Sequence, residues 1–160
     1  MTIATDDGTA QIDHILVADT GIFVIETKHY SGWIFGRPND RYWTQTIFKK
    51  KSRFLNPLRQ NYGHVKALQA LFTLPGSAFI PIVVFTGTAE FKTEVGQAVL
   101  KLHQLLSELS SDRPVVFDEK KMTYIVGRIE MKRLGRSIET DEYHQESVRR
   151  RVRERMVAGV

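Results

Sequence analysis

The sequence predicts an α/β domain in which helices flank a central mixed β-sheet. Two apolar runs at 12–17 and 21–28, separated by a short polar turn, indicate a β-hairpin rich in β-branched residues. A third apolar run at 79–87 follows a segment of helical periodicity, and helical patterns dominate after it. A hairpin, a helix, a further strand and then helices is an order typical of a mixed sheet covered by helices.

The bulk composition fits one domain over residues 1–160. The chain has 160 residues, of which 42% are apolar, enough for a single sizeable core. It has no cysteine, which excludes disulfides, thiolate zinc sites and cysteine nucleophiles. No apolar run approaches the roughly 20 residues that cross a bilayer, and the start lacks a signal-peptide pattern. We therefore expect a cytoplasmic protein with no membrane segment. Its net charge of +5 permits, without proving, a polyanionic partner.

The first hairpin brings charged residues together. Both of its strands are apolar on both faces, which indicates central strands covered on each side. If the turn is centred on the bond between Asp19 and Thr20, Asp13 lies directly opposite Glu26. Side chains alternate along a strand, so Lys28 shares the face of Glu26. A three-residue loop or a bulge at Gly21 would break this register.

The next segments predict a second hairpin and a helix. The sequence SGWIFGRPNDRYWTQT at 31–46 contains two short aromatic strands, and a basic stretch ending at Phe54 follows it. Asn56 and Pro57 have the cap and first-turn preferences of a helix that we expect to run to about Phe72.

The rest of the chain predicts one buried strand and three helices. The strand is FIPIVVFTG at 79–87, and a short strand near 99–105 passes into a helix. Two further helices are expected near 118–133 and 139–157.

Asp13, Glu26 and Lys28 have the chemistry of a hydrolytic metal site. Two opposed carboxylates on an apolar face need a cation. Lys28 supplies one charge, and a hard divalent ion such as Mg²⁺, which prefers oxygen ligands, would supply more. A bound metal lowers the pKa of water and polarises a phosphoryl oxygen. The alternative is an ordinary cross-strand charge network at the rim of the sheet.

Further residues are candidates for binding. Gln60 and His64 are spaced i and i+4 on the edge of the apolar face of the helix, where they could reach the same site or form a satisfied structural pair. Basic clusters could contact phosphates or simply face solvent; they comprise Lys49, Lys50, Lys51 and Arg53, and the run at 149–155. For Trp33 and Trp43 we favour core packing over base stacking, and His14 is expected to be packed.

These motifs resemble a known family. QIDHILVADTGIFVIETKHYSG, YWTQT and NPLRQNYGHVKAL occur in the order and close spacing of the nuclease-related domain, called the NERD domain. The resemblance spans about residues 11 to 75. It implies the restriction-endonuclease-like fold of the PD-(D/E)xK superfamily, in which Asp, Glu and Lys face one or two Mg²⁺ ions, with Mn²⁺ as a substitute.

The resemblance also implies roles for individual residues. Asp13 and Glu26 match the metal-binding carboxylates, with the backbone carbonyl of Thr27 as a further ligand. Lys28 matches the lysine that positions water. Gln60 matches the glutamine of the helix motif in RecB-like members, and His64 occupies the aromatic or histidine position of that motif.

The chain departs from the superfamily at its N-terminus. An earlier helix with another glutamate is usual, yet only ten residues precede Gln11. Ile3 and Ala4 are interpreted as the remnant of a strand, and Asp6 and Asp7 are not assigned as ligands. The domain is therefore expected to be N-terminally truncated, and the exposed sheet face predicts a homodimer or strand exchange.

Three hypotheses follow, in order of preference. The first is a Mg²⁺-dependent phosphodiesterase acting on DNA, with RNA as an open alternative, in which the basic clusters follow the backbone. The second is an inactive nucleic-acid-binding or assembly module that keeps the nuclease fold. The third is a structural interaction domain.

Overall fold

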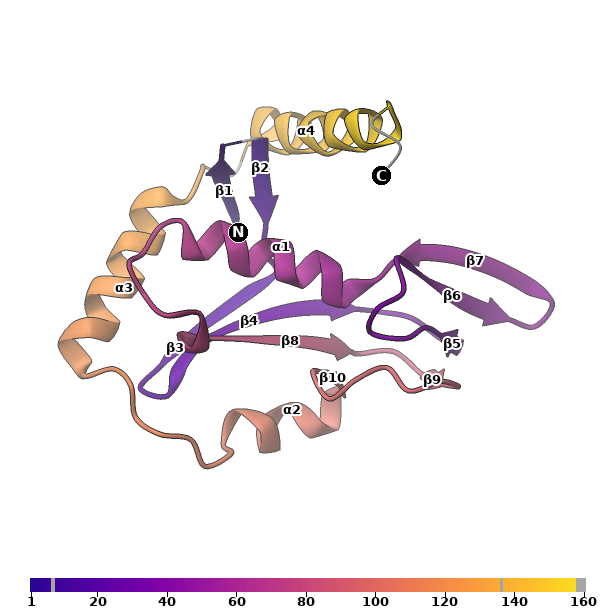
Figure 1. Cartoon of the computed structure of the whole chain (residues 1–160), viewed down its shortest axis with the longest axis horizontal. Coiled ribbons are helices and arrows are strands. Elements are labelled where there is room, and N and C mark those ends of the chain that lie inside the picture. The colour runs from indigo at the N-terminus through magenta and orange to yellow at the C-terminus, as the bar shows by residue number, and fades with distance from the viewer. Residues whose placement is uncertain (7, 136, 158–160) are drawn as a thin grey trace.

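A computed structural model describes residues 1–6, 8–135 and 137–157, without the side chains of 151, 152 and 155–157. Its centre is a mixed sheet with strand order β10-β8-β4-β3, and helices lie on both sides of it (Figure 1). The strands are β3 (His14–Ala18), β4 (Gly21–Lys28), β8 (Phe79–Phe85) and β10 (Val99–Lys101). The pairing of β3 with β4 is antiparallel, and β4, β8 and β10 run parallel. The predicted mixed sheet is confirmed.

A second sheet continues the first. Its order is β7-β6-β5-β9, with β5 (Gly32–Phe35), β6 (Tyr42–Ile47), β7 (Lys50–Leu55) and β9 (Ala89–Phe91). β4 leads into β5 and β8 into β9, and the parallel pairing of β4 with β8 is repeated between β5 and β9. The predicted second hairpin is confirmed, and the basic stretch after it is strand β7.

Gly32 permits the change of direction between β4 and β5. Its φ is +77°, and a Cβ there would lie 2.5 Å from the carbonyl oxygen of Thr46. An L-amino acid side chain would therefore meet both backbone strain and a clash.

Four α-helices cover the strands in the described part of the chain. They are α1 (Pro57–Gln69), α2 (Leu102–Leu109), α3 (Glu119–Lys132) and α4 (Ile138–Val157), and a short 3-10 helix, Gly76–Ala78, precedes β8. The Asn56 carboxamide oxygen accepts a hydrogen bond from the Leu58 N–H at 2.9 Å, which confirms the predicted cap. The predicted end of this helix, near Phe72, is three residues too far, because the Leu71 and Phe72 N–H groups bond three residues back in a tight turn.

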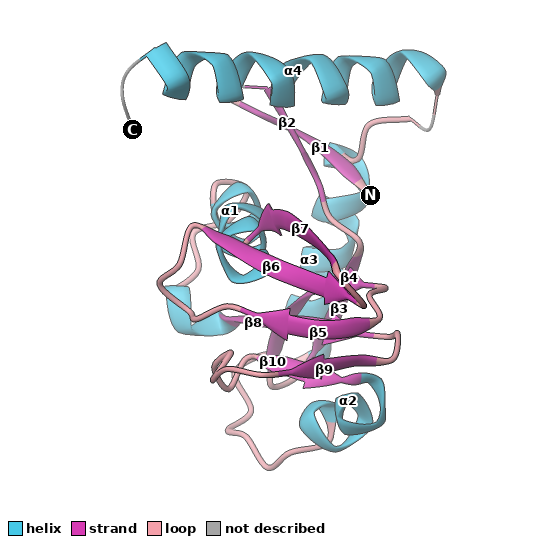
Figure 2. Ribbon diagram, turned by 90° about the vertical axis from the view of Figure 1, so that its right-hand side faces the viewer, coloured by secondary structure: helices cyan, strands magenta, loops and turns pink. Residues whose placement is uncertain are grey.

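The N-terminal residues form a separate hairpin. β1 (Thr2–Thr5) pairs with β2 (Gly8–Gln11), and α4 lies across this hairpin, away from the main sheet (Figure 2). The Thr9 hydroxyl is 2.8 Å from Nδ1 of His144 and 3.2 Å from the Ser147 hydroxyl. Ile3 and Ala4 are thus in a strand, as interpreted from the sequence. Asp7 lies outside the described residues, as do the side chains of Arg151 and Arg155.

The register of the first hairpin is confirmed for its paired residues. Ala18 pairs with Gly21, Val17 with Ile22 and Ile15 with Val24. The ladder ends at the pair of His14 with Ile25, one pair short of Asp13 and Glu26, so the predicted strand pairing of these two residues is not formed. The coverage of β3 was also predicted wrongly, because β3 is the edge strand of its sheet and His14 and Leu16 are exposed.

The two tryptophans differ. Trp43 is fully buried against Phe85, with which its ring is stacked, as the expected core packing requires. Trp33 is 50% exposed on the other face of the sheet, so the same expectation is wrong for Trp33.

The part of the chain that the structure describes contains no helix that could cross a membrane. Every helix there is too short or too polar to span a bilayer.

Candidate active site

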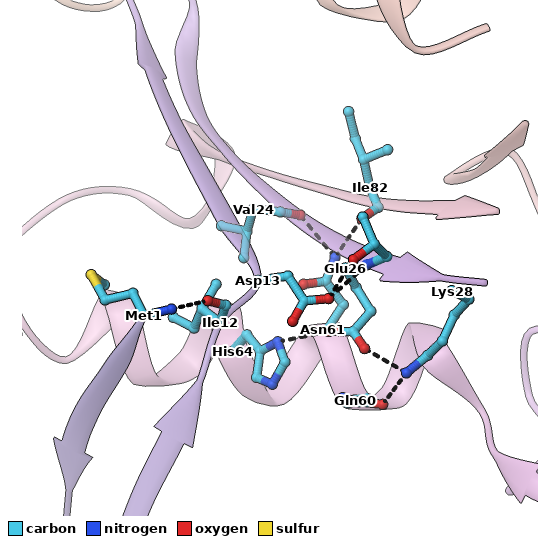
Figure 3. A network of polar contacts seen from close by, with 11 residues as sticks. Met1, Ile12, Asp13, Val24, Glu26, Lys28, Gln60, Asn61, His64 and Ile82 are labelled. Atoms are coloured by element: carbon cyan, nitrogen blue, oxygen red, sulfur yellow. Dashed lines mark hydrogen bonds and ion pairs between the residues drawn. The ribbon is translucent and has the colours of Figure 1, made fainter. Parts of the chain in front are cut away.

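The candidate site lies between the C-terminal end of β4 and helix α1. Alternation along β4 points the side chains of Glu26 and Lys28 to the face that α1 covers, and Gln60 and His64 point back from α1 (Figure 3). Four of the residues singled out from the sequence therefore meet here, although α1 and β4 are separated by the whole second hairpin.

Glu26 is the buried centre of the site, with only 2% of its surface exposed. Its Oε1 accepts a hydrogen bond of 2.6 Å from the Lys28 ammonium. Its Oε2 lies 3.3 Å from Nδ1 of His64. Neither Oε2 nor this nitrogen has a hydrogen-bond partner among the described residues. A buried carboxylate oxygen without a partner is costly unless another group binds it.

Lys28 links the strand to the helix. Besides Glu26, its ammonium donates a hydrogen bond of 2.9 Å to Oε1 of Gln60. An ammonium has three protons, so one remains for a further acceptor. The side chain of Lys28 is 18% exposed, which lets that acceptor come from solvent.

Asp13 stands at the end of the β3–β4 ladder. Its Oδ2 accepts hydrogen bonds from the Thr27 N–H at 2.9 Å and from the Thr27 hydroxyl at 2.8 Å. This carboxylate takes the place of a strand partner for Thr27, which explains why the ladder stops one residue before Asp13. In a strand, the N–H and C=O of one residue point to the same neighbour. The Thr27 carbonyl therefore faces the side on which Asp13 lies.

Asn61 is a supporting residue that the sequence reasoning missed. It is fully buried, and its Nδ2 donates to the Val24 carbonyl at 2.9 Å and to the Ile82 carbonyl at 3.0 Å. These bonds fix α1 across β4 and β8. A signal was present, because Asn61 lies three residues after Leu58 and four before Val65, within the apolar stripe of the helix.

Burial shifts the pKa values of Glu26 and His64, the two ionisable groups at the centre of the site. It raises the pKa of Glu26, and the nearby charge of Asp13 adds to this, whereas Lys28 opposes it through its hydrogen bond and its charge. Burial also lowers the pKa of His64 to about 4, with Asp13 opposing and Lys28 adding to the shift. At neutral pH His64 is therefore an uncharged imidazole.

The shift at His64 predicts acid lability of the metal-free protein. A histidine with a pKa near 6.5 when unfolded and about 4 when folded contributes stability above pH 6.5 that is lost as the pH falls toward 4. The loss is about 3 kcal/mol from the size of the shift. Glu26, with its raised pKa, works in the opposite direction, so the comparison must isolate His64.

Urea unfolding of the parent and of His64→Gln in chelator, at pH 7 and pH 4, measures this effect. The parent should lose about 3 kcal/mol more than the variant over that interval. Equal losses would show that His64 carries no buried titration.

The donor atoms of the site fit a small, hard cation that prefers oxygen ligands. They comprise Glu26 Oε2, which accepts no hydrogen bond from the described residues, the Asp13 carboxylate, whose two hydrogen bonds both go to Oδ2, and the Thr27 carbonyl. In the described part of the chain, no three His, Cys, Asp or Glu side chains are grouped to hold a metal. A site with two carboxylates suits Mg²⁺, which keeps several waters, better than zinc.

The predicted nucleic-acid residues other than His64 lie elsewhere. Lys50, Lys51 and Arg53 are on β7, the edge strand of the second sheet, and Lys49 is in the turn before it (Figure 1). Arg149, Arg150 and Arg153 lie on α4, the helix that crosses the N-terminal hairpin (Figure 2).

Comparisons with known proteins agree with the motifs. A family model described as the nuclease-related domain, NERD, matches residues 1–86. An uncharacterized protein of Bacillus anthracis is 56% identical over 72 residues, which are 44% of this chain and 34% of that protein. The chain thus spans about a third of the length of this curated relative. No solved structure gives a significant match.

Proposed function

The chain belongs to the nuclease-related domain family, within the restriction-endonuclease-like superfamily, and from this premise we propose that it is a metal-dependent nuclease of the PD-(D/E)xK type. The observation that carries the proposal is Oε2 of Glu26, a buried carboxylate oxygen near Asp13 that has no hydrogen-bond partner among the described residues. Family membership alone would leave the chemistry open.

Asp13, Glu26 and the Thr27 carbonyl would hold Mg²⁺ or Mn²⁺. When bound, the cation supplies Lewis acidity toward a phosphoryl oxygen and lowers the pKa of water. The two hydrogen bonds from Thr27 hold the Asp13 carboxylate in place before any cation arrives. Glu26 is held likewise by Lys28. Such preorganisation reduces the rearrangement that binding and reaction require.

Lys28 is the residue that would orient the attacking water. Its contacts with Glu26 and Gln60 fix the ammonium and leave one proton for a water or a phosphate oxygen. Gln60 thus acts as a positioning residue. His64 is neutral at physiological pH and contacts the side of Glu26 away from Lys28, so it lines the site without adding a charge.

The substrate we propose is DNA, with RNA as the competing polymer. The net charge of +5 and the basic run from Lys49 to Arg53 favour a polyanion. The absence of cysteine agrees with the reducing cytoplasm that we propose as the location.

The test is cleavage by the purified chain of supercoiled plasmid DNA and of labelled RNA, with Mg²⁺, Mn²⁺ or chelator. Asp13→Asn should abolish metal-dependent cleavage. The matched control is Asp19→Asn, an exposed aspartate in the turn of the same hairpin, which should leave cleavage unchanged. Salt-sensitive binding without turnover in any metal would contradict the nuclease proposal and favour an inactive binding module.

A further inference from the structure

The second sheet exposes aromatic side chains on the face that points away from the core. On β5, Ile34 is buried while its neighbours Trp33 and Phe35 are 50% and 38% exposed. Alternation along the strand therefore points Trp33 and Phe35 to one outer face. Figure 2 shows no helix in front of β5 and β6.

The neighbouring strands add a third aromatic residue and two cations to the same face. On β6, Trp43 is buried, so Tyr42 points outward and is 41% exposed. On β7, Phe54 packs inward, so alternation turns Lys51 and Arg53 outward. We call this surface the outer sheet face, which consists of Trp33, Phe35, Tyr42, Lys51, Arg53 and Leu55.

The register places these residues side by side. β6 lies between β5 and β7, where its Thr46 pairs with Trp33 on one side and Lys51 on the other. Thr44 likewise pairs with both Phe35 and Arg53. Each exposed aromatic residue of β5 thus lies two strands from an exposed cation of β7, across a short threonine.

Cations already lie over the exposed rings. The Arg53 guanidinium is 5.0 Å from the centre of the Tyr42 ring, and the Lys92 ammonium is 4.9 Å from that of Trp33. Glu90, paired with Trp33 on β9, is the acidic neighbour, and its carboxylate is bound to Lys92 at 2.7 Å. The outer sheet face therefore combines flat apolar rings with positive charge.

Folding alone does not account for this surface, since exposed aromatic residues grouped on one sheet face gain little from burial. We propose that the outer sheet face binds single-stranded nucleic acid, with bases stacked on Trp33 and Tyr42 and phosphates bound by Lys51, Arg53 and Lys92. Stacking on aromatic residues beside a basic track is how single strands are bound without sequence preference. A duplex hides its base faces and would use only the cations.

This proposal deepens the proposed function. Cleavage of the bound nucleic acid rests on the proposed nuclease activity, whereas binding itself does not. Lys28 and Trp33 are five residues apart in the sequence, so their Cα atoms are at most about 18 Å apart. The outer sheet face and the candidate active site are thus no farther apart than the length of a few nucleotides.

The test is binding of a fluorescent 20-nucleotide oligothymidylate to the full chain, in chelator so that no cleavage can occur. Anisotropy should show that Trp33→Leu weakens binding about 5- to 150-fold, the range expected for losing one stacked base. Trp33→Phe should keep most of the affinity because it keeps a ring. Base stacking should also quench Trp33 fluorescence in the parent, and the quenching should vanish in Trp33→Phe, where only the buried Trp43 is left.

Matched controls separate this surface from charge in general. Tyr124→Leu removes an exposed aromatic residue that also has a lysine over its ring, but on α3. Lys51→Ala with Arg53→Ala is compared with Lys120→Ala and Lys132→Ala, an equal change of charge on α3. Only the variants on the outer sheet face should weaken binding, and the melting temperature of each variant checks its folding.

Three results would overturn the proposal. They are equal effects of the Trp33 and Tyr124 variants, equal or tighter binding of the corresponding duplex, and no measurable binding by the folded parent at low salt. Cleavage of DNA could still be found in each case, so the failure of this inference and the failure of the nuclease proposal are distinguishable.

Discussion

Replacing Glu26 with glutamine should reduce metal-dependent cleavage at least about 100-fold and, without metal, make the protein more stable. Losing a residue that merely supports a metal ligand reduces affinity or activity by about 10- to 100-fold, and losing a ligand should exceed this. The shape of the side chain is kept, so the loss reports the carboxylate charge and not a packing defect.

The expected gain in stability has a separate cause. The raised pKa of Glu26 means that the folded protein disfavours its ionised form relative to the unfolded chain. Its contribution to stability is fully present below the unfolded pKa and is lost as the pH rises through the folded pKa. Glutamine stays neutral at every pH. The free energy of unfolding of Glu26→Gln at pH 8 should therefore exceed that of the parent by about 0.5–2 kcal/mol, the usual size of a single stabilising substitution.

Glu90→Gln is the matched control for both effects. Glu90 is also a strand glutamate followed two residues later by a lysine to which it is bonded, but it is 64% exposed. Cleavage and urea unfolding in chelator should be nearly unchanged. A parent and a Glu26→Gln variant of equal activity would contradict the assignment of Glu26, whatever their stabilities.

Replacing Asn61 with leucine should destabilise the protein by about 2–4 kcal/mol, because the leucine fills the space but cannot donate the two hydrogen bonds to Val24 and Ile82. Each buried carbonyl left short of a partner costs about 1–3 kcal/mol. Urea unfolding measures the change. Tyr62→Ala, at the adjacent position and 61% exposed, should stay within about 0.5 kcal/mol of the parent.

Asn61→Leu should also reduce metal-dependent cleavage, since Asn61 holds the helix that carries Gln60 and His64. A stable Asn61→Leu protein with unchanged cleavage would show that α1 is positioned by its apolar contacts alone.

Local patterns were enough to predict most of the fold. The alternating and apolar runs gave the strands β3, β4 and β8, and the Asn56–Pro57 pair gave the start of α1, because these signals depend on neighbouring residues. The meeting of Gln60 with Lys28 agrees with the family resemblance and with the position of Gln60 on the helix. The register near Gly21 was also correct, since a two-residue turn fixes it.

The errors concern features that depend on distant parts of the chain. Whether β3 is central or at the edge depends on which strand β8 joins, and β8 lies beyond α1. Asp13 leaves the ladder because its carboxylate binds the Thr27 backbone, a competition that strand periodicity does not describe. Trp33 and Trp43 look alike in sequence, but opposite faces of their sheet decide that one is exposed and the other buried.

All the side chains at the candidate site come from residues 13–64, and the strands behind them end at Phe85. Helix α3 adds an apolar cover to this unit through Ile125 and Ile129, and the Arg128 side chain donates a hydrogen bond of 2.7 Å to the Leu71 carbonyl. The polar groups of the candidate site thus come from one continuous stretch of sequence, whereas part of the apolar core beneath them comes from outside that stretch. Substitutions at Phe117, Ile125 or Ile129 can therefore change the stability of the site, but they remove none of its charged groups.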